Sequence, residues 1–356
     1  MTIAFVVSLL VLPADPEPIA QQSTPTSQSP SQPSTTRPSL APPPPVTLAF
    51  GGDVHFTGRT QELLADPASA FGPISAALSA ADIAMVNLET SITDRGVEEP
   101  KEFHFRAPPA ALDALAAAGV DITTLANNHA VDYGRVGLED TLAAVAASPI
   151  PVVGIGPDAA SAYAPYRFLV REVGISIFGA SQVPDRTYQR WTATGTQPGI
   201  ASTDDQDRLI AGVSQASAAG DVVVVYLHWG IERETCPTPA MSSLAAELAA
   251  AGADAIVGSH AHLLLGSGYL DRPGSTTYVS YGMGNFVWWR SDPLGDVTGV
   301  LTLTVRNGMV ADAVLTPAVI DDTGRPLPVS GPPAIEKLAA FEALRGCAGL
   351  LPTPAV

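Results

Sequence analysis

The segment "DDQDRLIAGVSQASAAGDVVVVYLHW", residues 204–229, decides the fold class. Its first part has the apolar spacing of an amphipathic helix, and its second part is a continuous apolar run of strand length. A helix followed directly by such a strand is typical of a parallel sheet that helices cover. The chain repeats this pattern from Val46 onward, so we expect an α/β protein.

The same alternation of strand and helix patterns predicts the other strands and helices of the chain. The late run 298–320 has strand patterns without intervening helices, so antiparallel strands are expected there. The pattern at 166–180 indicates a hairpin. The remaining expected strands lie at 46–52, 82–88, 120–126, 151–156, 221–229, 254–260 and 276–282. The expected helices lie at 74–81, 109–119, 136–147, 204–220 and 241–252.

Composition narrows the class of protein. The chain has 356 residues, of which 46% are hydrophobic, and this is enough to bury a sizeable core in one large domain with appendages. The formal net charge of -17 argues against a nucleic-acid partner, because phosphate binding needs clusters of Lys and Arg. No block of like charge stands out, so we expect a solvated acidic surface.

The ends of the chain differ in composition from its body. Residues 3–12, "IAFVVSLLVL", are apolar but shorter than the roughly 20 residues of a spanning helix. We expect 1–21 to be a signal peptide or N-terminal anchor, which places the protein outside the cell or at its surface; a chance apolar N-terminus is the alternative. Residues 22–45 have the Pro/Ser/Thr-rich composition of a disordered linker. The folded domain is then 46–320, with 321–356 as a C-terminal extension packing on it.

Two cysteines leave two interpretations open. In an exported protein, Cys236 and Cys347 could form one disulfide that pins a C-terminal helix to the body. In the cytosol they would be unpaired buried thiols. We favour the disulfide, and the spacing does not match a zinc site.

Polar side chains follow five of the expected strands, where ligands bind in α/β folds. Asp53 and His55 are two residues apart, as are His260 and His262, so each pair points to one face. Each residue alone is more typical of a cap or a turn. Imidazole and carboxylate at five strand ends together favour a site for Zn, Mn or Fe. The candidates are Asp53, His55, Glu89, Asn128, His129, His228, His260 and His262.

Seven motifs occur in order between about Leu48 and Val287: "GGDVHFTG", "VNLETSI", "FRAPP", "LANNHAVDYG", "HWGIE", "GSHAH" and "YGMGNF". Together they resemble the calcineurin-like metallophosphoesterase superfamily and, within it, the CapA-type poly-gamma-glutamate capsule biosynthesis proteins. The resemblance implies a sandwich of two mixed β-sheets flanked by helices.

The resemblance also implies two divalent metal ions and a role for each candidate. Glu89 would bridge both ions, although an Asp is usual there, and Asn127 stands where a Gly is usual; the number of ions therefore stays open. His129 would be the acid that protonates the leaving group. The expected ligands of one ion are Asp53, His55 and His262, and those of the other are Asn128, His228 and His260.

Further residues are candidates for contact with an anionic substrate. Arg106 and Arg59 are expected to offset the charge of its oxygens, with surface ion pairs as the alternative. Asn127, Trp229 and Asn285 are expected to shape the substrate site, with packing as the alternative.

Two functions follow from the resemblance. The first is a metal-dependent phosphoesterase-like hydrolase linked to poly-gamma-glutamate capsule biosynthesis, acting on an anionic small molecule or polymer. The second is a non-catalytic metal-binding accessory protein that binds polyglutamate or a membrane-bound capsule synthesis complex. An acidic protein is a poor platform for a polyanion unless metals supply positive charge, which favours the hydrolase.

Overall fold

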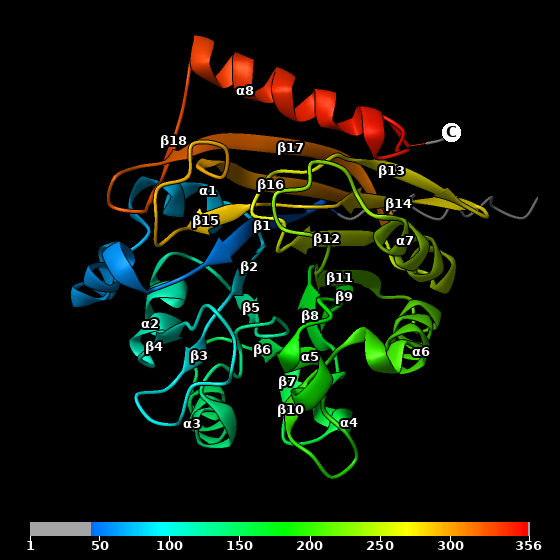
Figure 1. Ribbon diagram of the computed structural model, residues 1–356. Coiled ribbons are helices and arrows are strands. Elements are labelled where there is room, and N and C mark those ends of the chain that lie inside the picture. Colours follow the sequence, from blue (N-terminus) through cyan, green and yellow to red (C-terminus); the bar gives the residue numbers. More distant parts are fainter. Residues whose placement is uncertain (1–43, 355–356) are drawn as a thin grey trace, which may run out of the picture. The chain divides into compact units, whose positions relative to one another are not determined.

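The computed structural model describes residues 44–354 (Figure 1). The expected signal segment 1–21 and nearly all of the expected linker 22–45 lie outside the described residues. Within the described part, no helix combines the length and the apolar content needed to cross a membrane.

The first sheet is mixed and is built around β1 (Val46–Val54). The strands that run parallel on one side of β1 are β2 (Ile83–Leu88), β5 (Ile122–Thr124) and β6 (Val152–Val153). The antiparallel strands on the other side are β16 (Val297–Arg306), β17 (Met309–Ile320) and β18 (Pro326–Pro328). The short β15 (Asn285–Val287) pairs in parallel with the carboxyl end of β1.

The second sheet is also mixed. Its parallel strands are β9 (Val173–Ser181), β11 (Val222–His228), β12 (Ala255–Ser259) and β14 (Ser275–Ser280). Its antiparallel edge strands are β8 (Tyr166–Val170) and β13 (Ser267–Arg272). The expected α/β class, the hairpin at 166–180 and the antiparallel strands at 298–320 are confirmed.

Alternate residues of the central strands face different layers, because side chains in a strand point to opposite faces in turn. In β11, Val224 and Tyr226 enter a core between the two sheets, whereas Val223 and Val225 pack with the helices outside. The helices that cover the second sheet are α6 (Gln206–Ala218) and α7 (Pro239–Ala251). Those that cover the first are α1 (Ser75–Ser79), α2 (Ala110–Ala117) and α3 (Gly134–Ala146) (Figure 1).

The expected C-terminal extension contributes to both the sheet and the core. Strand β18 extends the first sheet, and α8 (Pro332–Ala343) lies along β17 (Figure 1). The side chain of Phe341 joins the core between the sheets. The 3-10 helix η5 (Leu344–Cys347) carries Cys347, which forms the expected disulfide with Cys236.

The connections contain short elements that sequence analysis does not predict. The short strands of this kind are β3 (Ser91–Ile92), β4 (Arg106–Ala107) and β10 (Gly199–Ile200). The expected strand at 151–156 is divided into β6 and β7 (Ile155–Gly156). The short α-helices are α4 (Ala159–Ala162) and α5 (Arg186–Trp191). The other 3-10 helices are η1 (Gly58–Ala65), η2 (Pro67–Ser69), η3 (Gly72–Ile74) and η4 (Thr203–Asp205).

The two sheets contact each other at the carboxyl end of β1. The hydroxyl of Tyr226 donates a hydrogen bond to the carbonyl of Gly51 at 2.9 Å. Gly52 allows the next contact, because a Cβ at this position would lie 1.9 Å from the carbonyl oxygen of Gly284. The polar residues that follow strands of both sheets are thereby brought to one place.

Candidate metal centre

Glu89 lies at the centre of the polar cluster and connects the two sheets. Its Oε2 lies 3.1 Å from Nε2 of His55, which follows β1 in the same sheet. Its Oε1 lies 3.3 Å from Nε2 of His228, which ends β11 in the other sheet. All three side chains are fully buried, so one carboxylate holds histidines from both sheets.

Asp53 forms a second junction between the sheets. Its Oδ2 accepts a hydrogen bond from the backbone N–H of His260 at 3.1 Å and lies 3.4 Å from Nδ1 of His262. Its Oδ1 accepts a hydrogen bond from Nδ2 of Asn87 at 2.8 Å. Sequence analysis does not single out Asn87, although it precedes Glu89 by two residues and therefore lies on the same face of the chain.

The ligand atoms of the cluster form two groups that share Glu89. One group contains Glu89, His260 and His262, and the other contains Asp53, Glu89 and His228; within each group the ligand atoms lie within 4.8 Å of one another. A carboxylate common to both groups matches the bridging position expected for Glu89. The grouping differs from the expected division, since His260 and His262 share one group and Asp53 and His228 share the other. His55 belongs to neither group and contacts Glu89 instead.

Asn128 presents an amide oxygen to the same cluster. Its Oδ1 lies 2.8 Å from Nε2 of His228. Its backbone carbonyl accepts hydrogen bonds from Thr187 Oγ1 at 2.6 Å and from Lys101 Nζ at 2.5 Å. These bonds fix the turn that carries Asn128 and the neighbouring His129.

His129 lies beside the two groups rather than within either. Its Nε2 is 3.9 Å from Oε1 of Glu89, and its Nδ1 is 2.7 Å from Oδ2 of Asp132. Because the carboxylate accepts, Nδ1 carries the proton of this hydrogen bond. Asp132 is fully buried and also accepts from the backbone N–H of Phe105 at 2.7 Å, while its Oδ1 lies 2.8 Å from Lys101 Nζ.

Neither Asp132 nor Lys101 is singled out by sequence analysis. The spacing of three residues between His129 and Asp132 is a weak signal, because it permits the contact only if the intervening chain turns. Lys101 lies in a loop and offers no sequence signal for a contact with Asp132.

Buried atoms without partners indicate that cations fit this centre. His55 Nδ1, Glu89 Oε1, His260 Nδ1 and His262 Nδ1 are buried, and none has a hydrogen-bond partner among the residues of 44–354. A buried polar atom without a partner costs folding free energy. Imidazole nitrogen and carboxylate oxygen are ligands of Zn, Mn and Fe, so divalent cations would satisfy these atoms.

The pKa shifts in the cluster favour the forms that bind metals. Burial opposes ionisation of Glu89, but the neighbouring His228 and His55 outweigh it and hold the pKa of that carboxyl well below its usual range. Burial, with His228 and His262 nearby, lowers the pKa of His260 well below its usual value. Burial also lowers the pKa of His55. The shifts therefore favour an ionised Glu89 and neutral imidazoles at His55 and His260, which are the forms that bind a divalent ion.

His262 differs from its neighbours. Burial lowers the pKa of its imidazole, but the Asp53 carboxylate, 3.4 Å from Nδ1, and the charge of Glu89 outweigh burial and raise the pKa above its usual value. A proton therefore competes with a cation for His262 as the pH falls.

The two arginines expected to contact substrate differ in their surroundings. Arg59 donates from Nε to the carbonyl of Trp288 at 3.1 Å and from Nη2 to the carbonyl of Arg290 at 2.9 Å, so its guanidinium is engaged with the backbone. Arg106 is exposed, and its guanidinium stacks 4.6 Å from the ring centroid of Tyr133. Arg106 forms no ion pair with another residue of 44–354, so its guanidinium is available to an anion.

The other three expected substrate contacts lie in the framework around the centre. Trp229 is fully buried and donates to the carbonyl of Tyr281 at 2.8 Å, so it offers no surface to a substrate. The Oδ1 of Asn127 accepts from the backbone N–H of His129 at 3.0 Å, which holds the turn. Asn285 is fully buried and donates to the carbonyl of Gly295 at 3.1 Å. Their positions do not support a role in substrate contact.

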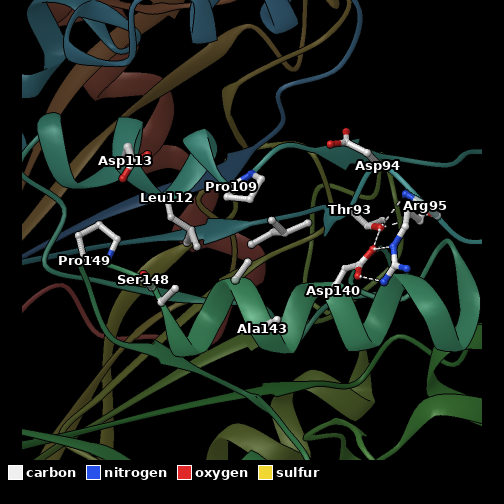
Figure 2. A pocket seen from close by; sticks show the side chains of 13 residues that line it. Thr93, Asp94, Arg95, Pro109, Leu112, Asp113, Asp140, Ala143, Ser148 and Pro149 are labelled. Atoms are coloured by element: carbon white, nitrogen blue, oxygen red, sulfur yellow. Dashed lines mark hydrogen bonds and ion pairs between the residues drawn. The ribbon is translucent and has the colours of Figure 1, made fainter.

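A separate cavity of about 660 Å³ lies between α2 and α3 (Figure 2). Its lining includes the apolar Leu112 and Ala143, and at one end Asp140 forms an ion pair with Arg95 and accepts from Thr93 (Figure 2). None of the candidate metal ligands lines it.

Comparison with known proteins identifies relatives. The family model described as bacterial capsule synthesis protein PGA_cap matches residues 47–288. The PGA biosynthesis protein CapA of Bacillus subtilis is 29% identical over 249 residues, 68% of this chain and 63% of that protein. A probable polyglutamine synthesis accessory protein of Mycobacterium tuberculosis is 33% identical over 196 residues, 52% of this chain and 50% of that protein. The chain thus spans about half to two thirds of the length of these relatives.

Two solved structures show a likeness of fold alone. The NAD nucleotidase of Haemophilus influenzae gives a TM-score of 0.49 at 16% identity, covering 88% of this chain and 58% of that one. The sulfate thiohydrolase SoxB of Thermus thermophilus gives a TM-score of 0.44 at 15% identity, covering 85% of this chain and 61% of that one.

Proposed function

The chain belongs to the bacterial capsule synthesis protein family, and from that premise we propose that it is a divalent-metal-dependent hydrolase of phosphate esters. One observation carries this proposal. Glu89 belongs to two groups of buried ligand atoms, and the His129–Asp132 pair lies beside it at 3.9 Å. A mononuclear structural site would need neither the shared carboxylate nor the adjacent histidine with its own carboxylate partner.

Two ions of Mn, Zn or Fe would be held by the cluster, and Glu89 would be a ligand available to both. When bound, such ions lower the pKa of a water and offset negative charge on phosphoryl oxygens. The residues that would hold them are Asp53, His55, Glu89, Asn128, His228, His260 and His262.

His129 would provide the proton that the leaving group needs. Asp132 binds the Nδ1–H of the ring, which leaves Nε2 as the nitrogen that faces Glu89. A proton on Nε2 can pass to the leaving-group oxygen as the ester bond breaks, and the buried carboxylate stabilises the imidazolium from which it comes. Arg106 would offset charge on the non-bridging oxygens.

We also propose where the protein works. Its relatives are named for the biosynthesis of a capsule polymer, which suggests an exported protein that acts at the cell surface beside a membrane-bound capsule synthesis complex. The disulfide Cys236–Cys347 supports this location, since disulfides persist in oxidising compartments.

The test uses the full chain loaded with Mn or Zn. We expect it to cleave a generic phosphomonoester or phosphodiester, and His129→Ala to lose turnover by roughly 10²- to 10⁴-fold while its metal content is unchanged. His104→Ala is the matched control, because His104 contacts the carbonyl of Glu99 and lies outside the cluster. If the metal-loaded protein cleaves no ester but binds polyglutamate, the hydrolase proposal is wrong and the accessory function takes its place.

A further inference from the structure

An aromatic surface begins at His129 and continues outward. We define this aromatic wall as Phe105, Trp289 and Phe103 with Arg290. The ring of Phe105 lies 4.3 Å from that of His129 and 5.6 Å from that of Trp289, between ring centroids. The ring of Trp289 lies 6.2 Å from that of Phe103. The rings therefore form a continuous path from the proposed acid.

The aromatic wall becomes more exposed with distance from the metal centre. Phe105 is only 6% exposed, Trp289 is half-buried, and Phe103 is 41% exposed. Apolar side chains gathered at the mouth of a polar site are a feature of ligand-binding surfaces, because burying them in a complex stabilises it. The outer end of the aromatic wall is thus open to a ligand, and its inner end lies against the ring of His129.

The backbone of the aromatic wall is fixed without a ligand. Arg59 donates to the carbonyls of Trp288 and Arg290, the residues on either side of Trp289. Gly58 also lies against Trp289, since a Cβ at this glycine would be 3.3 Å from the Trp289 carbonyl oxygen. The guanidinium of Arg59 therefore holds the backbone of the aromatic wall and is not free to contact a substrate directly.

Arg290 adds an unpaired positive charge at the outer end. Its Cζ lies 5.1 Å from the ring centroid of Trp289 and 5.8 Å from that of Phe103. The side chain is exposed and takes part in no ion pair with another residue of the described range. A guanidinium stacked on rings keeps its N–H edge free for a carboxylate or phosphate.

We propose that the aromatic wall is the binding subsite for the leaving group of the ester, and that this leaving group carries a flat ring with an anionic substituent beyond it. The ring packs on Trp289 and Phe103, and the substituent pairs with Arg290. The inference rests on the proposed function, because the leaving group must extend away from the residue that protonates it. An acidic peptide would use Arg290 but has no ring for the aromatic surface.

The test measures binding, so it does not depend on turnover. Titration calorimetry of the Mn-loaded protein would compare naphthylmethyl phosphonate with methylphosphonate. Trp289→Ala and Phe103→Ala are each expected to weaken binding of the naphthyl compound by about 5- to 10-fold and to leave methylphosphonate unchanged. Tyr166→Ala is the matched control, because this aromatic residue is 43% exposed on β8, outside the aromatic wall.

A second pair of variants tests the charge. Arg290→Gln should weaken binding of a carboxylated naphthylmethyl phosphonate by about 5-fold. Arg306→Gln is the control, since Arg306 is an exposed arginine at the end of β16, outside the aromatic wall. Equal losses for the naphthyl and methyl ligands would overturn the inference, and so would oligoglutamate binding that is stronger than naphthyl binding and unaffected by Trp289→Ala.

The two proposals fail in different ways. If the protein binds the naphthyl ring selectively but hydrolyses no ester, the aromatic wall is a ligand-binding surface and the hydrolase proposal is wrong. If the protein hydrolyses esters but does not select for the ring, the hydrolase proposal stands and the aromatic subsite is wrong.

Discussion

The contact between Lys101 and Asp132 gives the sharpest prediction, because it secures the partner of His129. Lys101 Nζ lies 2.8 Å from Asp132 Oδ1, and the lysine side chain is 13% exposed whereas the aspartate is fully buried. Lys101→Met keeps an unbranched side chain that is shorter by one atom and removes its charge. Asp132 would then be a buried carboxylate supported only by His129 and the N–H of Phe105.

The size of the effect follows from this burial. Removing one partner of a buried ion pair costs about 3–5 kcal/mol of unfolding free energy. Because Lys101 retains some contact with water, we expect the lower end, about 3 kcal/mol. Asp132→Asn should also destabilise, since Lys101 would then lose its fully buried carboxylate partner and keep only the partly exposed Asp185 at 3.4 Å. The double variant should cost about 2 kcal/mol less than the sum of the two single variants, because it leaves neither Lys101 nor Asp132 as an unpaired charge.

Equilibrium urea unfolding, followed by circular dichroism with a chelator present, would measure the unfolding free energies of the unsubstituted protein, the two single variants and the double variant. Lys337→Met is the control, because Lys337 on α8 is the only other lysine of the chain. Lys101→Arg should recover most of the lost stability and turnover. Additive effects within about 0.5 kcal/mol would refute the reasoning, because contacting residues that act as a pair do not behave independently.

Three further predictions concern other parts of the molecule. Adding Mn or Zn at about 100 times its Kd should stabilise the protein by about 2.7 kcal/mol per site in thermal unfolding, and Glu89→Gln should abolish most of that gain. Arg95 and Thr93 lower the pKa of Asp140 from 3.8 to about 2. The ionised Asp140 therefore contributes its full stabilisation above the pKa of the unfolded chain, 3.8, and this contribution is lost as the pH falls through about 2. Asp140→Asn should remove this part of the pH dependence of the unfolding free energy between pH 3.8 and about 2. Cys347→Ser opens a loop with a sequence separation of 111 and should lower the unfolding free energy by about 2–4 kcal/mol in urea, whereas an unchanged midpoint would show that the disulfide does not stabilise the fold.

Long apolar runs made most of the fold predictable. The expected strands at 46–52 and 221–229 correspond to β1 and β11, because a strand buried between layers must be apolar along its whole length. The short β15 was not predictable. Its sequence "NFV" pairs with the end of β1 near Asp53, and only the folded chain brings these segments together.

The sequence predicts the residues that form the buried cluster, but not the residues that support it. Imidazole and carboxylate after strands are recognisable because few other roles require those groups at that position. Asp132 and Lys101 act through contacts between loops, which leave no periodic signal. Arg59 was expected to contact the substrate but instead binds backbone carbonyls. A guanidinium can donate to a carbonyl as well as to an anionic substrate, so the sequence alone does not distinguish the two roles.

The length of Glu89 explains how one residue can contact histidines of both sheets. It follows the last residue of β2, where its backbone N–H donates to the carbonyl of Val54 and holds it close to β1. From there its two oxygens separate, one toward His55 of the same sheet and one toward His228 of the other. Asn87, on the same face and two residues earlier, binds Asp53 and lies 3.2 Å from Nδ1 of His228. Because Asn87 fills the space next to Asp53 and His228, the carboxylate must reach the centre from further along the chain, and the additional methylene of a glutamate provides that reach.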